Sequence, residues 1–139
     1  MIKSISLPIL CALLIAPVLA QTEQYDGYSI AFTKDRASGT AVFEKRSFDE
    51  IWTATIKALK LDKYKIEAAE RESGRISAIL LPAWGQTYDL LGGEPHWEIF
   101  VKATEGNVQL TFVAENIEAP TKAIRSLCKK IAKRLAKTE

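Results

Sequence analysis

His96 is the only histidine of the chain, and Cys128 is one of its two cysteines. Structural zinc usually requires several Cys or His ligands at regular spacing, so these residues predict neither a metal site nor a cofactor. A reactive thiolate needs an exposed, electropositive setting. Cys128 instead falls on the apolar stripe of a predicted helix, and we expect it in the core.

Carboxylates near His96 are the other candidates for acid-base chemistry. Asp89, Glu94 and Glu98 could divide the roles of acid and base if their pKa values were split, but any acidic surface offers such residues. The pair Gly92-Gly93 is followed by no lysine and opens no helix, unlike a phosphate-binding loop. We therefore predict no catalytic residue, and a small periplasmic enzyme using His96 with a nearby carboxylate remains the alternative.

The irregular connection 82–95 carries the residues that we predict to bind a ligand. It combines three glycines and two prolines with the large side chains of Trp84, Tyr88, Leu90 and Leu91. Exposed aromatic groups on a loop are a common binding anchor. The alternative is that these side chains fold back over the open end of a sheet and bury themselves.

A basic, amphipathic segment ends the chain. Pro120 is suited to the first position of a helix, and apolar residues then recur at helical spacing. The remaining surface of this predicted helix carries seven cations: Lys122, Arg125, Lys129, Lys130, Lys133, Arg134 and Lys137. They form either a solvated outer face or a contact for lipid headgroups. The stripe has no Trp or Phe, which favours docking on a sheet.

The elements that position these residues follow from hydrophobic periodicity. Ser47 and Glu50 have the spacing of a capping box, and the pattern predicts a helix over Phe48 to Leu61. Alternating residues predict six strands, at 28–33, 40–45, 64–68, 75–81, 96–104 and 108–114, joined largely as hairpins. The fold class is therefore α+β, with an antiparallel sheet of about five or six strands covered on one face by two helices.

The N-terminus predicts export. Lys3 precedes an uncharged apolar stretch that ends in Ala20, which is typical of a signal peptide over residues 1–20. Pro8 and Pro17 interrupt the stretch, which favours cleavage over a retained membrane anchor. Residues 21–139 then form one domain, in which we expect the polar segment 21–27 to be flexible. We expect the mature protein to have no membrane span and a periplasmic or secreted location.

Composition limits the remaining classes of function. The 139 residues are 47% hydrophobic and 26% charged, which excludes disordered and collagen-like chains. The net charge of +2 favours no nucleic-acid partner, and no aromatic-basic interleaving marks a sheet face. The composition fixes no oligomeric state.

Several of these segments together resemble a known kind of domain. Four stretches resemble the opening of small helix-grip domains of bacterial envelope proteins. They are residues 47–52, Leu59, residues 64–67 and residues 72–78. The best-known examples are the repeated domains of the BamC lipoprotein of the outer-membrane β-barrel assembly machinery. The resemblance implies a helix-grip-like two-layer sandwich, with Trp52 anchoring the helix and Gly74 making a turn. It also implies an envelope setting.

These observations favour an exported envelope protein that acts as a non-catalytic binding or accessory module. Its expected partner is another envelope protein or a lipid-like ligand, contacted through Trp84, Tyr88, Leu90 and Leu91. A free edge of the sheet offers a second surface, on which a strand could be added.

Overall fold

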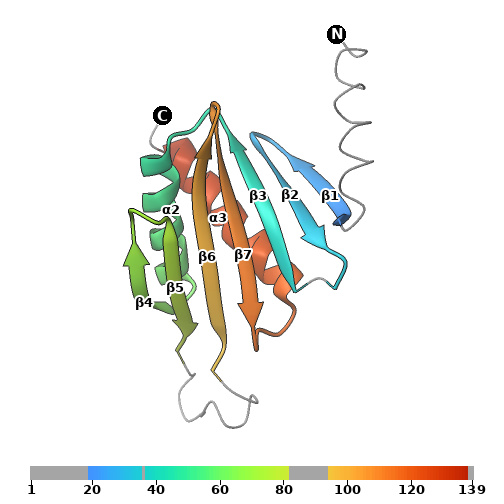
Figure 1. The fold of residues 1–139 in the computed structure, drawn as a ribbon, viewed down its shortest axis with the longest axis vertical. Helices are drawn as coiled ribbons and strands as arrows, with labels where there is room; N and C mark the ends of the chain where they lie inside the picture. Colours follow the sequence, from blue (N-terminus) through green and yellow to red (C-terminus); the bar gives the residue numbers. More distant parts are fainter. Residues whose placement is uncertain (1–18, 36, 82–93, 138–139) are drawn as a thin grey trace.

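The computed structural model of the chain describes residues 19–35, 37–81 and 94–137. This part of the chain forms seven strands and two helices, with one hydrophobic core between the sheet and the helices (Figure 1). In chain order the elements are β1 (Leu19–Tyr25), β2 (Tyr28–Thr33), β3 (Ser38–Glu44), α2 (Phe48–Leu61), β4 (Tyr64–Glu70), β5 (Arg75–Leu80), β6 (His96–Thr104), β7 (Asn107–Glu115) and α3 (Pro120–Lys137).

The strands form a single antiparallel sheet in the order β1-β2-β3-β7-β6-β5-β4. Five of the neighbouring pairs join strands that follow directly in sequence: β1-β2, β2-β3, β4-β5, β5-β6 and β6-β7. The pairing of β3 with β7 joins the group β1-β2-β3 to the group β7-β6-β5-β4. The α+β class and the antiparallel sheet are confirmed, but the expected count of five or six strands is wrong because the sheet has seven.

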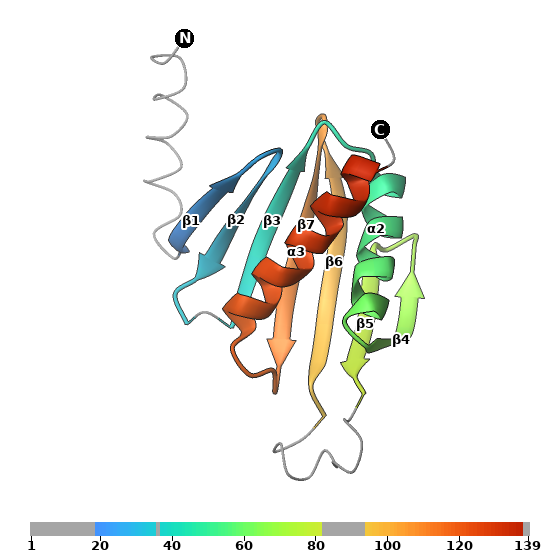
Figure 2. The ribbon, with the colours of Figure 1, turned by 180° about the vertical axis from the view of Figure 1, so that it is seen from behind.

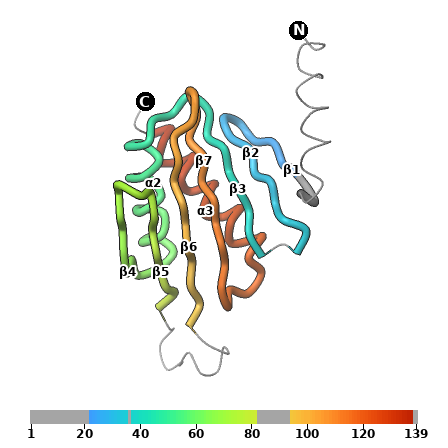
Figure 3. Tube along the Cα trace, viewed as in Figure 1, coloured from blue at the N-terminus to red at the C-terminus, as the bar shows by residue number. Residues whose placement is uncertain are grey.

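The additional strand is β1, which occupies most of the segment that we expected to be flexible. Its register pairs Thr22 with Ala31 and Glu23 with Ile30. Hydrophobic periodicity did not predict this strand, because its side chains are mostly polar. An edge strand exposes much of its surface and needs no alternation of apolar residues. The structure thus places residues 21–25 of that segment in the sheet. Figure 3 shows β1 at one edge of the sheet and β4 at the other.

Local hydrogen bonds and backbone conformation define both ends of helix α2. The Ser47 hydroxyl accepts a hydrogen bond from the Glu50 amide at 3.2 Å, and the Glu50 carboxylate accepts one from the Ser47 amide at 2.9 Å. This reciprocal capping box confirms the predicted helix start. The hydrogen bond from the Ser47 amide also lowers the pKa of Glu50. At the other end, Lys63 adopts a φ of 68°, which turns the chain into β4.

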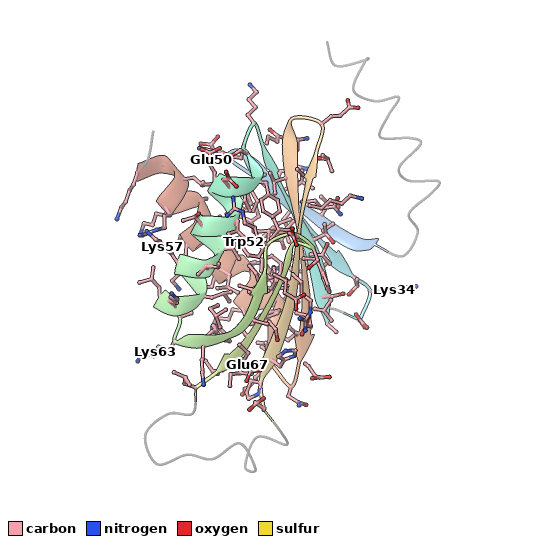
Figure 4. All side chains as sticks on the ribbon, turned by 60° about the vertical axis from the view of Figure 1, so that its left-hand side comes forward. Lys34, Glu50, Trp52, Lys57, Lys63 and Glu67 are labelled. Atoms are coloured by element: carbon pink, nitrogen blue, oxygen red, sulfur yellow. The ribbon has the colours of Figure 1, made fainter. Side chains whose placement is uncertain are left out.

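Both helices lie on the same face of the sheet, side by side, as Figure 2 shows. Lys130 of α3 contacts Asp62 at the end of α2, at 2.5 Å. Helix α3 buries the predicted stripe of Ile124, Leu127, Cys128, Ile131 and Leu135. In Figure 4, Trp52 points from α2 toward the sheet and Lys57 points away from it. The helices therefore shield the sheet's apolar face, and no helix of the described residues covers its other face.

The turn between β4 and β5 depends on a glycine, as the sequence predicted. Gly74 has a φ of +74°, and a Cβ at this position would lie 2.2 Å from the Val101 carbonyl oxygen. The Val101 amide donates a hydrogen bond to the Gly74 carbonyl at 2.7 Å. The glycine thus lets the turn press against β6. Within the described ranges, neither helix is sufficiently long and apolar to cross a membrane.

Candidate functional site

The predicted binding residues Trp84, Tyr88, Leu90 and Leu91 lie outside the described residues. Their role stays a prediction. Among the residues that the structure does describe, two arrangements of polar side chains could carry chemistry. One surrounds His96 on the open face of the sheet, and the other lines a groove beside α3.

His96 begins β6 and contacts three polar side chains. Its Nε2 atom lies 2.7 Å from the Ser77 hydroxyl oxygen and 3.0 Å from a Glu98 carboxylate oxygen. Its Nδ1 atom lies 3.7 Å from a Glu115 oxygen. The sheet register explains this cluster, because Ser77 lies opposite Glu98 and His96 lies opposite Glu115. The structure thus brings His96 together with Glu98, one of the three candidate carboxylates, and adds Ser77, which the sequence analysis missed.

The carboxylate of Glu98 is already held by a guanidinium. Arg75 donates two hydrogen bonds to it, at 2.8 Å and 3.1 Å. These bonds raise the pKa of Arg75 above its usual value, with the negative charge of Glu98 as the second cause. Glu98 is therefore shared between a permanent cation and His96, and both of its carboxylate oxygens already have a partner.

The contact between Ser77 and His96 has the distance of a nucleophile and its base. The surroundings differ from those of a serine hydrolase. Ser77 is only 5% exposed, in the middle of a strand that is paired with β4 and β6. Amides in such ladders bind neighbouring strands and are not free to stabilise an oxyanion. The cluster therefore fits a structural polar network on the sheet better than an active site.

A groove beside α3 is the second arrangement, and we call it the α3 groove. It encloses about 780 Å³ between the β1-β2 turn, the start of α2 and the outer side of α3. Its lining comprises Tyr25, Asp26, Gly27, Tyr28, Arg46, Arg125, Lys129, Ala132, Lys133 and Ala136. In Figure 2, β1 and β2 extend sideways beyond α3.

Stacked aromatic rings form one wall of the α3 groove. Tyr25 stacks on Tyr28 with ring centroids 4.8 Å apart, and Tyr28 stacks on Phe43 at 5.0 Å. Tyr25 is 40% exposed, whereas Tyr28 is 7% exposed. Burial is the main cause that raises the pKa of Tyr28 to about 12. The stack runs from solvent into the core, so it fixes the Tyr25 ring in place.

The four cations of the α3 groove fall into two groups. Arg125 forms a bidentate ion pair with Glu23, and Arg46 pairs with Glu50 at 3.2 Å. Lys129 and Lys133 are exposed and have no hydrogen-bond or ion-pair partner in the described part of the chain. Two arginines are thus neutralised by carboxylates, and two lysines one helical turn apart are available to a ligand.

Cys128 lies in the core beneath this groove, as the helical pattern predicted. Burial raises the pKa of its thiol far above the ordinary value, so it stays protonated and unreactive. Within residues 19–35, 37–81 and 94–137, no cluster of three or more His, Cys, Asp or Glu side chains has the arrangement of a metal site.

The sequence analysis missed the α3 groove, although it identified the cations of α3. The signal was present in the basic face of the helix, but the opposing wall comes from β1, which the sequence did not reveal as a strand. No protein family model matches the chain, and no curated protein shows significant similarity to it.

Proposed function

We propose that this protein is an exported, non-catalytic binding module of the bacterial envelope, and that the α3 groove is a binding site in it. The proposed partner is another envelope protein or a lipid-like ligand. The signal-like N-terminus and the resemblance to helix-grip envelope domains support the location. The two-layer arrangement of sheet and helices is consistent with that resemblance.

One observation carries the proposal: two unneutralised lysines stand beside a preformed aromatic wall. Lys129 and Lys133 face a groove whose other lining includes the stacked rings of Tyr25 and Tyr28. A concave surface that combines apolar area with a few charged groups is typical of binding sites. The chain as a whole carries only +2, so this positive charge is local rather than a consequence of bulk composition.

Site-specific photo-crosslinking in cells tests the proposal. A photoreactive residue replaces Ala136, which lines the α3 groove and is exposed. The matched control replaces Lys65, an exposed residue of β4 at the far edge of the sheet. A third variant carries the photoreactive group at position 88, in the predicted aromatic segment.

The proposal expects a defined adduct from position 136 that is weakened when Lys129 and Lys133 are changed to glutamine. The Lys65 position should give no such adduct. An adduct from position 88 alone would move the binding site to the aromatic segment and overturn the role of the α3 groove. Equal labelling from positions 136 and 65 would show nonspecific contact.

The contact between Ser77 and His96 favours one second candidate, a small periplasmic hydrolase that uses His96 with a nearby carboxylate. The 2.7 Å distance between Ser77 Oγ and His96 Nε2 supports it. A fluorophosphonate probe tests this candidate, because it labels activated serines. Labelling that disappears in both Ser77→Ala and His96→Ala would favour the enzyme. If the protein is a binding module, we expect the probe to label no serine. Crosslinking from position 136 should then be unchanged in the Ser77→Ala and His96→Ala variants.

A further inference from the structure

We infer that the ligand of the α3 groove is an anionic amphiphile with a single small headgroup. This inference deepens the proposed function and rests on it. The headgroup contacts the ammonium groups of Lys129 and Lys133. The apolar part lies against Ala132, Ala136 and the ring of Tyr25, all of which line the same groove.

The charge pattern selects a negative headgroup. Lys129 and Lys133 are four residues apart on α3, so their side chains project from the same side of the helix. Like charges at this spacing repel each other and weaken the helix slightly when no counterion is bound. No acidic partner faces either lysine among the described residues, and Asp26 is the only carboxylate in the lining. A bound anion removes this repulsion.

The number of free cations limits the charge of the ligand. Arg125 is held by Glu23 through hydrogen bonds of 2.9 Å and 2.5 Å, and Arg46 is held by Glu50. A ligand would have to break these pairs to use the arginines. Two lysines alone match one phosphate or carboxylate group, and they do not match an extended polyanion such as a nucleic acid.

The floor of the groove selects an apolar tail. Ala132 and Ala136 share the four-residue spacing of the lysines and lie in the same lining. Their short side chains leave space along α3, and Tyr25 supplies an exposed ring opposite. Inorganic phosphate would leave this apolar surface uncovered. The volume of about 780 Å³ falls within the range of small-molecule sites, which favours a single amphiphile over a protein segment.

A second cavity shows what a site without this selectivity looks like. It encloses about 470 Å³ between the start of α2 and the end of α3. Its lining includes Asp49 and Glu50 as well as Lys57, Arg134 and Lys137. No aromatic ring lines this cavity, so the apolar part of an amphiphile would find no comparable wall there. Of the two cavities, only the α3 groove combines unneutralised cations with an aromatic wall.

Titration of the purified protein with dodecyl phosphate, below its micelle concentration, tests the inference. Amide chemical shifts follow the groove residues, and calorimetry gives the affinity. Dodecyl maltoside carries the same tail on a neutral headgroup, and inorganic phosphate carries the headgroup without a tail. We expect dodecyl phosphate to bind at least about tenfold more tightly than either, with shifts at Gly27, Ala132 and Ala136.

Matched variants separate the headgroup contact from general charge. Lys129→Gln/Lys133→Gln should weaken dodecyl phosphate binding about tenfold or more. Lys57→Gln/Lys60→Gln removes the same charge from exposed positions on α2 and should leave the affinity unchanged. Ala136→Leu should weaken the binding of dodecyl phosphate, because the larger side chain fills the apolar floor of the groove. Circular dichroism spectra confirm that each variant is folded.

The inference is overturned if dodecyl maltoside or inorganic phosphate binds as tightly as dodecyl phosphate, or if the α2 variant loses as much affinity as the α3 variant. Absence of dodecyl phosphate binding also overturns it. If crosslinking from position 136 still captures a defined protein, the binding module stands and only the amphiphile is wrong. If position 136 captures nothing either, both proposals fail.

Discussion

Arg125 of α3 and Glu23 of β1 form a bidentate ion pair across 102 residues of sequence. Both guanidinium nitrogens in the pair donate to the carboxylate, and the Arg125 guanidinium also lies 5.1 Å from the centroid of the Phe32 ring. Glu23 additionally accepts a hydrogen bond from the Tyr25 hydroxyl at 2.5 Å. A single carboxylate thus ties the edge strand to the helix and helps to orient one wall of the α3 groove.

Replacing Glu23 with glutamine should loosen β1 without unfolding the domain. The pair is partly exposed, with side chains 39% and 20% accessible, so its contribution is small, on the order of 1 kcal/mol. Hydrogen exchange should therefore accelerate roughly three- to tenfold at the β1 amides that pair with β2, since edge strands open locally. Amides of β6 and β7 should keep their protection.

The control for this prediction is Glu118→Gln, which removes one exposed carboxylate outside the groove. It should leave the exchange of β1 unchanged. Acceleration that is uniform over the whole sheet in Glu23→Gln would instead mean that the ion pair supports global rather than local stability.

The sequence could not reveal this relationship, although it predicted most elements. Strands β2, β6 and β7 carry an apolar residue at every second position, and Ser47 with Glu50 marks the start of α2 by local chemistry alone. In β1, the inward Glu23 is compensated by Arg125, far along the chain. Hydrophobic periodicity reports burial against apolar neighbours, and a strand held by an ion pair gives no such signal.

Gly74→Ala should destabilise the protein strongly. An added Cβ would meet the Val101 carbonyl oxygen at 2.2 Å, and the φ of +74° disfavours any residue with a side chain. Left-handed backbone costs about 1–2 kcal/mol for alanine, and displacement of β6 adds to that cost, for a total of at least about 2 kcal/mol. Urea unfolding measures the loss.

Gly106→Ala separates the two causes of that loss. Gly106 also has a positive φ, of +72°, but a Cβ there would meet nothing within 4 Å. It should cost only the backbone strain, about 1–2 kcal/mol. Equal losses in the two variants would contradict the close approach of the Gly74 turn to β6.

The candidate sites show a similar division between what sequence does and does not predict. His96 and Glu98 are two residues apart in one strand and so share a face, and Glu98 was one of the three candidate carboxylates. Ser77 joins them because β5 pairs with β6 in one particular register. A shift by one residue would turn Ser77 to the opposite face, so its place depends on tertiary structure.

Lys63→Gly should stabilise the protein modestly. Lys63 follows the end of α2 with a φ of 68°, and its amide donates to the Lys60 carbonyl at 3.0 Å. Glycine adopts this left-handed conformation at the end of a helix without a Cβ penalty. We expect a gain of roughly 0.5–1 kcal/mol in the free energy of unfolding. Lys60→Gly, inside the last turn of the helix, is the control and should destabilise by about 1 kcal/mol.

Tyr28 should make the protein less stable at high pH. Burial, then the charges of Cys128 and Tyr25, raises its pKa from 10.0 to about 12. The folded protein therefore holds the phenol proton more tightly than the unfolded chain does. This contribution to stability is complete below pH 10.0 and is lost as the pH rises toward about 12, at up to roughly 1.4 kcal/mol per pH unit.

Tyr28→Phe removes this titration and should flatten the alkaline fall in stability. Cys128, whose pKa burial also raises, titrates in the same direction, so both proteins should carry Cys128→Ala to isolate the phenol. The measurement is the free energy of urea unfolding at about pH 9 and at about pH 11, where the tyrosine protein should lose roughly 1 kcal/mol more than the phenylalanine protein. Equal losses would show that the Tyr28 phenol ionises as readily in the fold as in the unfolded chain. That result would contradict its burial between Tyr25 and Phe43, and with it the rigid aromatic wall of the α3 groove.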